Sequence, residues 1–282
     1  MISASDIPMD TALIFGATFV GLFLGKALNM VVSHLPNALH RQWDANSLKS
    51  VTEAPATRIA TVLPLRIQCP NCQTTLRTKD SFPIVSFALL GGKCRDCSQR
   101  LSWREPLVEM CTGLLLAACV LRWGASWQAV TASCFSCSLL TLALIDWDTS
   151  LLPDAITQPL VWGGLVVSGL GVNHLQLEQS LAGAVLGYAF LWFPHSIYKL
   201  LTGKEGMGHG DFKLTAAMGA WLGAVSLMPV ILIATLTGAC FGVIQKIRGS
   251  MGEQGYFPFG PFLALAGLLV LFSGIRLTSE GV

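Results

Sequence analysis

The chain has 282 residues, of which 52% are hydrophobic and 12% are charged. Soluble domains carry about 25% charged residues, so this composition excludes an ordinary soluble enzyme and predicts a membrane protein. The formal net charge of +2 gives no indication of nucleic-acid binding. The elements expected from the sequence are therefore membrane helices and the segments that connect them.

Eight apolar runs approach the length of about 20 residues that is needed to cross the hydrocarbon core of a bilayer. They lie at residues 12–33, 106–122, 127–146, 155–172, 179–200, 212–225, 227–245 and 257–276. The first run has no basic segment before it and no small-residue cleavage site after it, so we expect a retained anchor and not a secretory signal. The predicted fold class is an all-α polytopic membrane protein with about eight transmembrane helices.

A polar segment of domain size separates the first two runs, and Pro36 is expected to end the first helix. The predicted organisation is an N-terminal transmembrane helix (1–33), a small soluble domain (34–105) and a helical bundle (106–282). The apolar residues 82–90 are too few to cross a bilayer. We expect them to pack within the soluble domain or to lie at the membrane surface.

The basic residues are distributed unevenly along the chain. Of the 18 Lys and Arg, ten lie in the polar segment and five flank two later connections. With eight spans and both termini outside, the positive-inside rule places these basic residues in the cytoplasm. The polar segment is therefore predicted to be a cytoplasmic domain of a bacterial inner-membrane protein.

Four of the nine cysteines form two C-x-x-C pairs in the polar segment, Cys69 with Cys72 and Cys94 with Cys97. Four thiolates at this spacing are typical of a closed tetrahedral zinc site that stabilises a small domain. Two disulfides are the alternative. The predicted cytoplasmic location favours zinc, because cytosolic thiols are kept reduced.

Carboxylates at the ends of membrane helices are costly and are therefore candidates for function. Asp146 ends the third run and Asp148 follows it, Asp154 directly precedes the fourth, and Asp211 directly precedes the sixth. On the predicted topology all four face the cytoplasm. We expect Asp146 and Asp211 to be a catalytic pair, in which one carboxyl keeps its proton while the other activates a water against a peptide carbonyl.

Neighbouring residues are expected to support this pair. Gly208 and Gly210 allow turns and a close approach of the backbone to an extended substrate. Asp148 is expected to lie nearer water and to orient or solvate the site, whereas Asp154 is equally well placed as a helix N-cap. Glu109, in the second run, is expected to be a polar packing partner between helices.

Three other functions remain open at this point. A transporter or channel would line an ion path with the aspartates, although such paths usually place charge near the middle of the membrane. An intramembrane serine protease would need a serine that faces His195, a residue more often found as a polar packing group. A catalytically inactive scaffold would keep the same fold.

The sequence resembles the bacterial type IV prepilin peptidases, a family of intramembrane aspartyl proteases with a Gly-x-Gly-Asp motif. The motif here is Gly208-His209-Gly210-Asp211, and the likeness runs nearly from end to end. The other matching segments are Leu28-Asn29-Met30-Val31-Val32, Leu35-Pro36, both C-x-x-C pairs with Gly91-Gly92-Lys93, Pro106-Leu107-Val108-Glu109, Ile145-Asp146, Leu152-Pro153-Asp154, Gly203-Lys204-Glu205-Gly206-Met207, Phe212-Lys213-Leu214 and Pro258-Phe259-Gly260-Pro261-Phe262.

The resemblance implies that Asp146 and Asp211 are catalytic and that the substrates are type IV prepilins and type II secretion pseudopilins. It implies cleavage of a short basic leader after a glycine, at the cytoplasmic membrane face and just before the apolar helix of the pilin. It also implies methylation of the new N-terminal residue, usually phenylalanine, with S-adenosylmethionine as the donor. No glycine-rich loop of the dinucleotide type marks a site for this donor.

One segment departs from the family pattern. The first helix carries Gly25-Lys26-Ala27-Leu28-Asn29 where Gly-Ser-Phe-Leu-Asn is usual, and His34 stands where arginine is common. These positions fall in a region that is associated with methyl transfer in the family. Lys26 is an intramembrane charge, and Glu109 is its expected partner.

Overall fold

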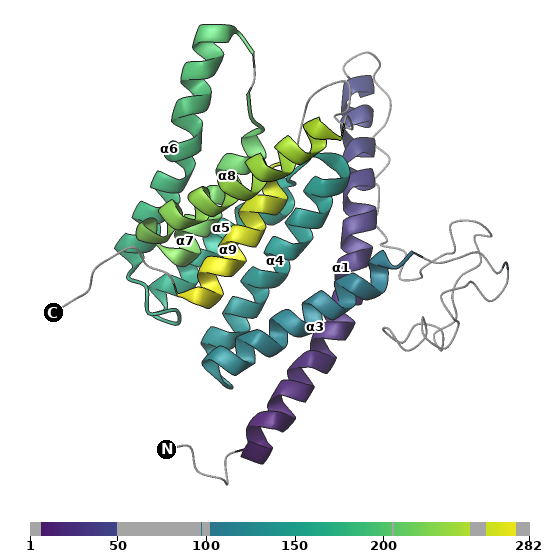
Figure 1. The fold of residues 1–282 in the computed structure, drawn as a ribbon, viewed down its shortest axis with the longest axis vertical. Helices are drawn as coiled ribbons and strands as arrows, with labels where there is room; N and C mark the ends of the chain where they lie inside the picture. The colour runs from purple at the N-terminus through teal and green to yellow at the C-terminus, as the bar shows by residue number, and fades with distance from the viewer. Residues whose placement is uncertain (1–6, 50–96, 98–101, 205, 249–257, 275–282) are drawn as a thin grey trace. The chain divides into compact units, whose positions relative to one another are not determined.

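The computed structural model describes residues 7–49, 97, 102–204, 206–248 and 258–274. Within these ranges the regular structure is entirely α-helical (Figure 1). The chain divides into two compact units, residues 1–125 and residues 126–282. The apolar residues 82–90 lie outside the described ranges, as does most of the predicted soluble domain, so the predicted domain bounds stay predictions.

Unit 1 contains α1 (Ile7–Lys49) and α3 (Arg104–Trp123), which pack against each other. The prediction that the first helix ends at Pro36 was wrong, because α1 continues through this proline to Lys49. A proline inside a helix removes one backbone hydrogen bond at a cost of about 3 kcal/mol, which a long helix can absorb. The apolar part of α1 does end there, since its candidate membrane span is Thr11–Pro36.

Glycines bring α1 and α3 into backbone contact. A Cβ atom added to Gly21 would lie 2.6 Å from Cα of Gly113, and one added to Gly25 would lie 2.6 Å from Cα of Glu109. On α3, a Cβ atom on Gly113 would lie 3.2 Å from the carbonyl oxygen of Thr18. Small residues at such crossings let membrane helices gain van der Waals contact that larger side chains would prevent.

Unit 2 contains the remaining described helices. They are α4 (Trp127–Thr149), α5 (Asp154–Gly169), α6 (Leu177–Thr202), α7 (His209–Leu222), α8 (Ala224–Ile247) and α9 (Gly260–Ser273). Helices α5 and α6 pack against α7, while α4 and α8 pack against α9; Figure 1 shows α4 and α9 side by side. Large buried side chains, among them Phe135, Leu139, Met218 and Leu263, fill the core between them.

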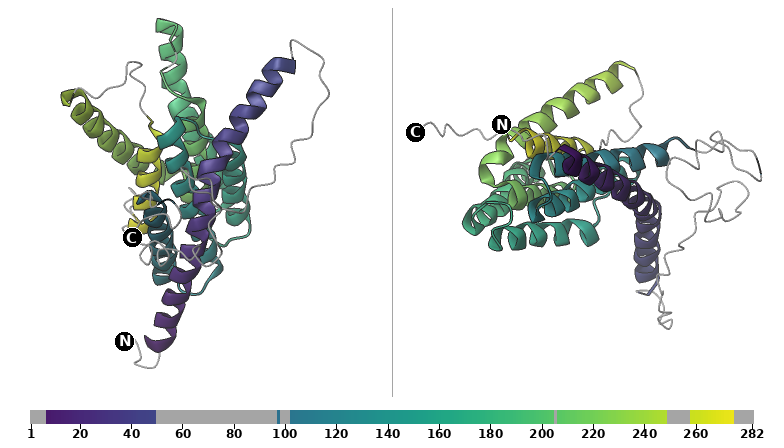
Figure 2. Two further views of the ribbon diagram at one scale, coloured as in Figure 1. Left: turned by 90° about the vertical axis from the view of Figure 1, so that its right-hand side faces the viewer. Right: turned by 90° about the horizontal axis from the view of Figure 1, so that it is seen from below.

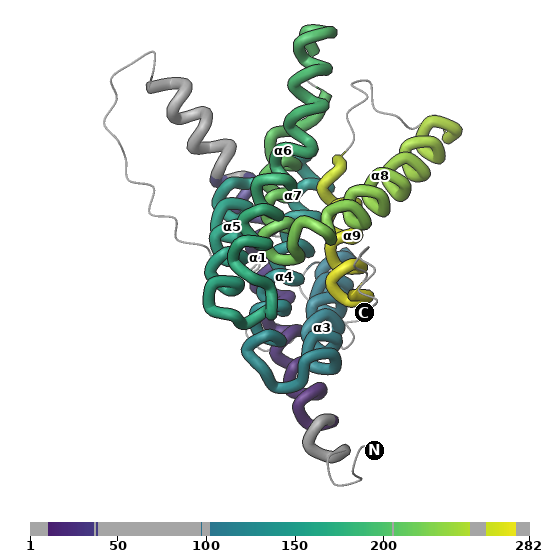
Figure 3. Tube along the Cα trace, turned by 90° about the vertical axis from the view of Figure 1, so that its left-hand side faces the viewer, coloured from purple at the N-terminus to yellow at the C-terminus, as the bar shows by residue number. Residues whose placement is uncertain are grey.

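The contact between α6 and α7 is also made through glycines. A Cβ atom on Gly183 would collide with the carbonyl of Gly219, and one on Gly219 would collide with the carbonyl of Gly183. Ser180 reinforces the contact, because its hydroxyl donates a 2.6 Å hydrogen bond to the carbonyl of Ala220. Beyond this contact the last turns of α6 and α8 project from unit 2 and diverge, as Figures 2 and 3 show.

Each of the eight apolar runs predicted from the sequence falls mainly on one described helix, although the run 212–225 also includes the first two residues of α8. Among the described residues, five helices are long and apolar enough to cross a membrane, namely α1, α3, α4, α6 and α8. Helix α9 is a shorter apolar helix, and α5 and α7 have 16 and 14 residues. The chain is thus a multi-pass membrane protein whose regular structure is helical throughout the described residues, and the count of eight spans stays a prediction.

Candidate active site

Asp146 lies in the last turn of α4 and is 4% exposed. Helix α4 ends because Ser150 adopts the left-handed conformation, with φ of 53°, and donates its N–H to the carbonyl of Asp146. The Oδ2 atom of Asp146 accepts a 2.9 Å hydrogen bond from the backbone N–H of Gly260, the first residue of α9. The first N–H groups of a helix lack intrahelical partners and carry partial positive charge, so they stabilise a buried carboxylate.

Asp211 lies in the first turn of α7 and is 5% exposed. Gly208 is the N-cap of this helix, and its carbonyl accepts the N–H of Asp211 at 3.2 Å. In return, the Asp211 carboxylate interacts with the backbone N–H of Gly208. This reciprocal arrangement is that of the acidic residue in a capping box. Both buried aspartates are therefore held by the backbone at the start of a helix.

The structure brings Asp146 and Asp211 together at one end of unit 2. Their carboxylates are close enough for the charge of Asp146 to act on Asp211. Asp146 comes from the C-terminal end of α4, and Asp211 comes from the N-terminal end of α7. Two carboxylates in such a site cannot readily both ionise, so the pair can hold one proton and one negative charge. In that state the protonated carboxyl group can act as an acid and the ionised one as a base.

Gly210 allows α7 to approach the connection between α4 and α5. A Cβ atom on Gly210 would lie 2.6 Å from Cβ of Leu152, which is closer than side-chain atoms approach each other. Leu152 itself packs against the hydrophobic core of unit 2. The sequence suggested that Gly210 leaves room for a substrate, whereas in the structure Gly210 leaves room for Leu152.

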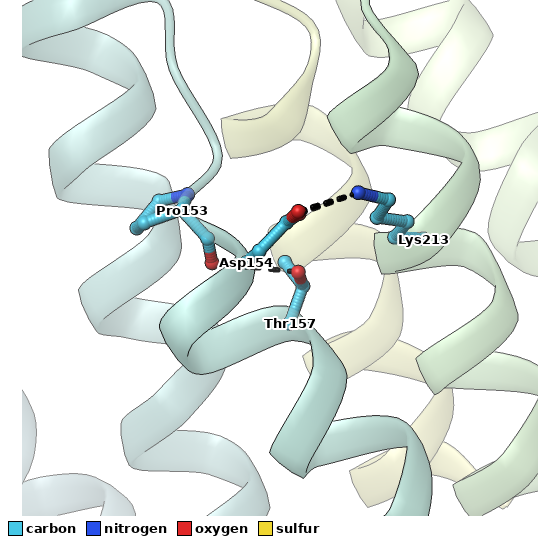
Figure 4. A network of polar contacts seen from close by, with 4 residues as sticks. All are labelled: Pro153, Asp154, Thr157 and Lys213. Atoms are coloured by element: carbon cyan, nitrogen blue, oxygen red, sulfur yellow. Dashed lines mark hydrogen bonds and ion pairs between the residues drawn. The ribbon is translucent and has the colours of Figure 1, made fainter. Parts of the chain in front are cut away.

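Asp154 is not the N-cap of α5, so this expectation was wrong. Pro153 occupies the N-cap position without a side-chain hydrogen bond, and Asp154 is the first residue of the helix. Its carboxylate instead receives two hydrogen bonds from Nζ of Lys213, at 2.6 Å and 2.7 Å (Figure 4). A cation on α7 attracts the carboxylate away from its own helix. The ion pair ties the first turn of α5 to the N-terminal part of α7, two residues after Asp211.

Two other candidate residues, Asp148 and His195, lack the surroundings that a catalytic role in place of Asp146 and Asp211 would need. Asp148 is exposed, as expected for a residue nearer water. His195 is 7% exposed, and its ring contacts the rings of His209 and Phe212. Within the described part of the chain, Nδ1 of His195 has no hydrogen-bond partner. The described contacts therefore give His195 no serine of the kind that a serine protease would need.

Gly260 is a site residue to which the sequence gave no role. A Cβ atom here would lie 2.7 Å from Oδ2 of Asp146, so only glycine allows the N–H to reach the carboxylate. The signal was present in the sequence, because Pro261 follows Gly260 at the start of an apolar run. A proline in the first turn is typical of a helix N-terminus, where backbone N–H groups can bind an anion.

The predicted zinc site lies almost entirely outside the described residues. Of its four cysteines the structure describes Cys97, which is partly buried. In the described ranges there is no group of three or more His, Cys, Asp and Glu side chains that could hold a metal ion. The zinc site therefore stays a prediction from the cysteine spacing.

In unit 1, the intramembrane Lys26 has the partner that the sequence suggested. Lys26 of α1 interacts electrostatically with Glu109 of α3 and, more weakly, with Glu105. Glu109 is 7% exposed, and the side-chain amide of Asn29 donates a 3.0 Å hydrogen bond to the carbonyl of Glu105. A buried charge needs such compensation in a membrane.

Comparisons with known proteins match both units. The type IV leader peptidase family matches residues 133–243, and the bacterial peptidase A24 N-terminal domain matches residues 19–123. The first match contains both Asp146 and Asp211. The second contains the two C-x-x-C pairs. No solved structure matches the chain.

Several curated proteins are similar over almost their whole length. A prepilin leader peptidase/N-methyltransferase of Pseudomonas aeruginosa is 41% identical over 95% of this chain and 92% of its own length. Proteins of the same name from Pseudomonas putida and Aeromonas salmonicida are 42% and 39% identical, over 92% and 94% of this chain and 90% and 93% of their own lengths. With this identity and coverage, and with two buried aspartates at one end of its second unit, the chain belongs to the type IV leader peptidase family.

Proposed function

We propose that this chain removes the short basic leader from type IV prepilins and type II secretion pseudopilins, with Asp146 and Asp211 as the catalytic residues. The observation that carries the proposal is the approach of two buried carboxylates from α4 and α7 in a member of the type IV leader peptidase family. The reaction takes place at the cytoplasmic face of the bacterial inner membrane, where the basic leader of the substrate lies.

Peptide hydrolysis by this pair needs one carboxyl group that is protonated and one that is ionised. The ionised aspartate accepts a proton from a water molecule as the water oxygen attacks the carbonyl carbon of the scissile bond. The protonated aspartate donates a hydrogen bond to the carbonyl oxygen, where negative charge develops. The tetrahedral intermediate then collapses, the C–N bond breaks, and a carboxyl proton passes to the leaving amine.

The backbone contacts of the two aspartates suit this chemistry. Gly260 donates to Asp146, and the N–H of Gly208 interacts with Asp211. Donors at helix ends are fixed by the fold and need no reorganisation when charge moves during the reaction. The burial of both aspartates excludes bulk water and strengthens each electrostatic interaction. The supporting residues Asp154 and Lys213 hold α7 in place from outside the buried pair.

The relatives' name also supports a second activity, methylation of the new N-terminal residue. S-adenosylmethionine is the methyl donor in this proposal, since its sulfonium group transfers a methyl group to an amine without a redox partner. This activity is separable from cleavage. A chain with Asp146→Asn should still methylate a pilin whose leader has already been removed, and transfer of a labelled methyl group would measure it.

A structural zinc ion is proposed for the segment before α3. Cys69, Cys72, Cys94 and Cys97 supply four thiolates, which satisfy a tetrahedral zinc ion completely and leave no position for water or substrate. In this proposal the metal stabilises the small cytoplasmic domain and takes no part in peptide cleavage.

The experiment that tests the proposal is cleavage of a prepilin by membranes that contain equal amounts of each variant. Asp146→Asn and Asp211→Asn should each reduce the rate by at least about a thousandfold, because either change removes the proton transfer. Asp148→Asn, a matched change two residues away on the same helix, should lower the rate far less, because Asp148 is exposed and would only orient or solvate the site. Normal cleavage by either Asp146→Asn or Asp211→Asn would show that the catalytic pair is wrong.

A further inference from the structure

Three of the five residues that precede Asp211, at positions 206–210, are glycines. Because glycine has no side chain, these positions offer other helices only backbone to contact. The side chains that can hold the first turn of α7 are therefore the remaining ones around Asp211. On the α5 side the holding contact is the ion pair of Asp154 with Lys213, two residues after Asp211 (Figure 4).

On the α6 side, the start of α7 is contacted by the ring of His195. This ring lies edge to face against the rings of His209 and Phe212, with centroids 5.7 Å and 5.2 Å away. The rings of His209 and Phe212 also contact each other, at 5.6 Å. These two residues stand on either side of Asp211 in the sequence. Because aromatic rings prefer a few defined geometries, one ring from α6 restricts the residues both before and after Asp211.

Helix α6, which the structure describes over its whole length, contacts α7 differently in its two halves. Its buried residues are Ser180, Gly183, Ala184, Gly187 and His195. Gly187 ends the first half of this contact, since a Cβ atom there would lie 2.5 Å from the carbonyl oxygen of Thr215. About two turns further along, His195 is the one buried residue of the second half. It is thus the buried side chain of α6 that reaches the first turn of α7.

The Nδ1 atom of His195 does not explain why this residue is buried. Among the residues that the structure describes, Nδ1 meets no hydrogen-bond donor or acceptor. A buried polar atom without a partner lowers the stability of a protein. What His195 supplies at this position is a flat ring that packs between His209 and Phe212, the latter fully buried.

We propose that His195 is a positioning residue, whose ring holds the first turn of α7 in the orientation in which Asp211 faces Asp146. This inference rests on the proposed function and adds a residue of α6 to it. His195 transfers no proton in the reaction. It acts on cleavage through the place of the Asp211 carboxylate, and the ring carries this effect, not the nitrogen atoms.

Steady-state cleavage of a prepilin separates the ring of His195 from its nitrogen atoms. His195→Ala removes the ring and should lower kcat about tenfold or more, because the Asp211 carboxylate is no longer held, while KM stays within about twofold. His195→Phe keeps a ring and should leave kcat within about threefold of the wild type. It should also raise the unfolding temperature by about 2–4 °C, since it replaces a buried polar atom that the fold leaves without a partner.

Phe193→Ala is the matched control. It removes an aromatic ring from the same turn of α6, but this ring is 62% exposed, so kcat and KM should match the wild type. If His195→Ala does not accumulate in the membrane, His195→Leu takes its place. Leucine fills the volume without offering a flat ring, and kcat should again be lower than in His195→Phe.

The pH dependence of kcat gives a second readout, which a loss of stability alone would not change. A pair of aspartates that works with one proton is active between the loss of its first proton and the loss of its second. Repulsion between the two carboxylates keeps these steps apart. If Asp211 moves away from Asp146, the repulsion weakens, and the active pH range should be narrower in His195→Ala than in His195→Phe. Both variants lack the imidazole of residue 195 and keep every other ionisable group, among them His209 and Lys213.

The outcomes separate this inference from the proposed function. A wild-type kcat in His195→Ala, or equal pH ranges in the alanine and phenylalanine variants, would make His195 a packing residue only and overturn the inference. An equal loss of kcat in both variants would overturn it too, because a nitrogen atom and not the ring would then be needed. In each case the peptidase stands if Asp146→Asn and Asp211→Asn abolish cleavage. Normal cleavage by those aspartate variants would instead show that the catalytic assignment is wrong.

Discussion

The backbone N–H of Gly260 donates a 2.9 Å hydrogen bond to Oδ2 of Asp146, a residue 114 positions earlier in the chain. The contact joins the first residue of α9 to the last turn of α4. Because the donor is a main-chain group, no side-chain exchange at position 260 removes the donor itself. With Asp146 kept, the contact can be disturbed at its donor end by adding a Cβ atom to Gly260.

Gly260→Ala should therefore impair catalysis far more than it impairs folding. The new Cβ atom would lie 2.7 Å from Oδ2, so the Asp146 carboxylate must move. A displacement of about 1 Å in a catalytic group costs on the order of a hundredfold in rate, and we expect that loss in kcat. Gly169→Ala is the control, since its Cβ atom would meet only Leu177, at 3.9 Å. A wild-type kcat in Gly260→Ala would show that this contact does not position Asp146.

The Asp154–Lys213 ion pair should matter for activity more than for stability. Both side chains are partly exposed, at 55% and 31%, and an exposed ion pair contributes about 0–1 kcal/mol to the free energy of unfolding. The pair nevertheless fixes the first turn of α7, which carries Asp211. Asp154→Asn and Lys213→Met should each lower kcat by about two- to tenfold through misplacement of Asp211.

The charge-exchanged double variant, Asp154→Lys with Lys213→Asp, separates the ion pair from other effects of these substitutions. It should recover part of the lost kcat, and thermal unfolding of all variants should stay within a few degrees of the wild type. If the double variant is worse than the sum of the single variants, the two residues do not act through their mutual attraction.

Packing between α1 and α3 should depend strictly on Gly25. A leucine there would drive its side chain into the backbone of α3 near Glu109, where even a Cβ atom would lie 2.6 Å from Cα. Overpacking at a backbone contact should cost about 3 kcal/mol or more and reduce the amount of protein in the membrane. Gly16→Leu, on the same helix with nothing within 4 Å, should accumulate normally. Equal abundance of the two variants would contradict the packing described for unit 1.

The full-length chain should contain about one zinc ion per molecule after purification, because four thiolates complete one tetrahedral site. Cys72→Ser and Cys94→Ser should lose the metal and lower the thermal stability of the protein, whereas Cys134→Ser, in the membrane helix α4, should keep it. Metal analysis of the purified variants measures this. Zinc-free wild-type protein with intact cleavage would leave the disulfide alternative, which thiol titration would then reveal.

The topology should place the predicted soluble domain and the aspartates on the same, cytoplasmic side. A reporter fused near residue 60 should report the cytoplasm, and one fused at His174 should report the periplasm. His174 lies between α5 and α6, at the end of α5 opposite to Asp154. The reverse pattern would place the aspartates on the periplasmic side and exclude cleavage of a cytoplasmic leader.

The sequence by itself determined the class of protein and the candidate aspartates. Apolar runs of membrane length predict helices regardless of how they pack, because backbone polar groups in lipid must be satisfied within each segment. Asp146 and Asp211 were recognisable for a related reason, since a carboxylate at the end of an apolar run carries a cost that only function or pairing offsets. The expected pairing of Lys26 with an interior carboxylate such as Glu109 followed from the same principle.

Only the tertiary structure decided how these residues are held. The contact of Gly260 with Asp146, the pairing of Asp154 with Lys213 and the contact of Gly210 with Leu152 each join helices that are far apart in the sequence. Local rules offered Asp154 as a helix N-cap and predicted that the first helix ends at Pro36. Those rules failed because they consider only residues close in the sequence. The position of the Asp154 carboxylate depends on Lys213, which comes from another helix. The continuation of α1 depends on the remaining hydrogen-bonded turns on both sides of Pro36.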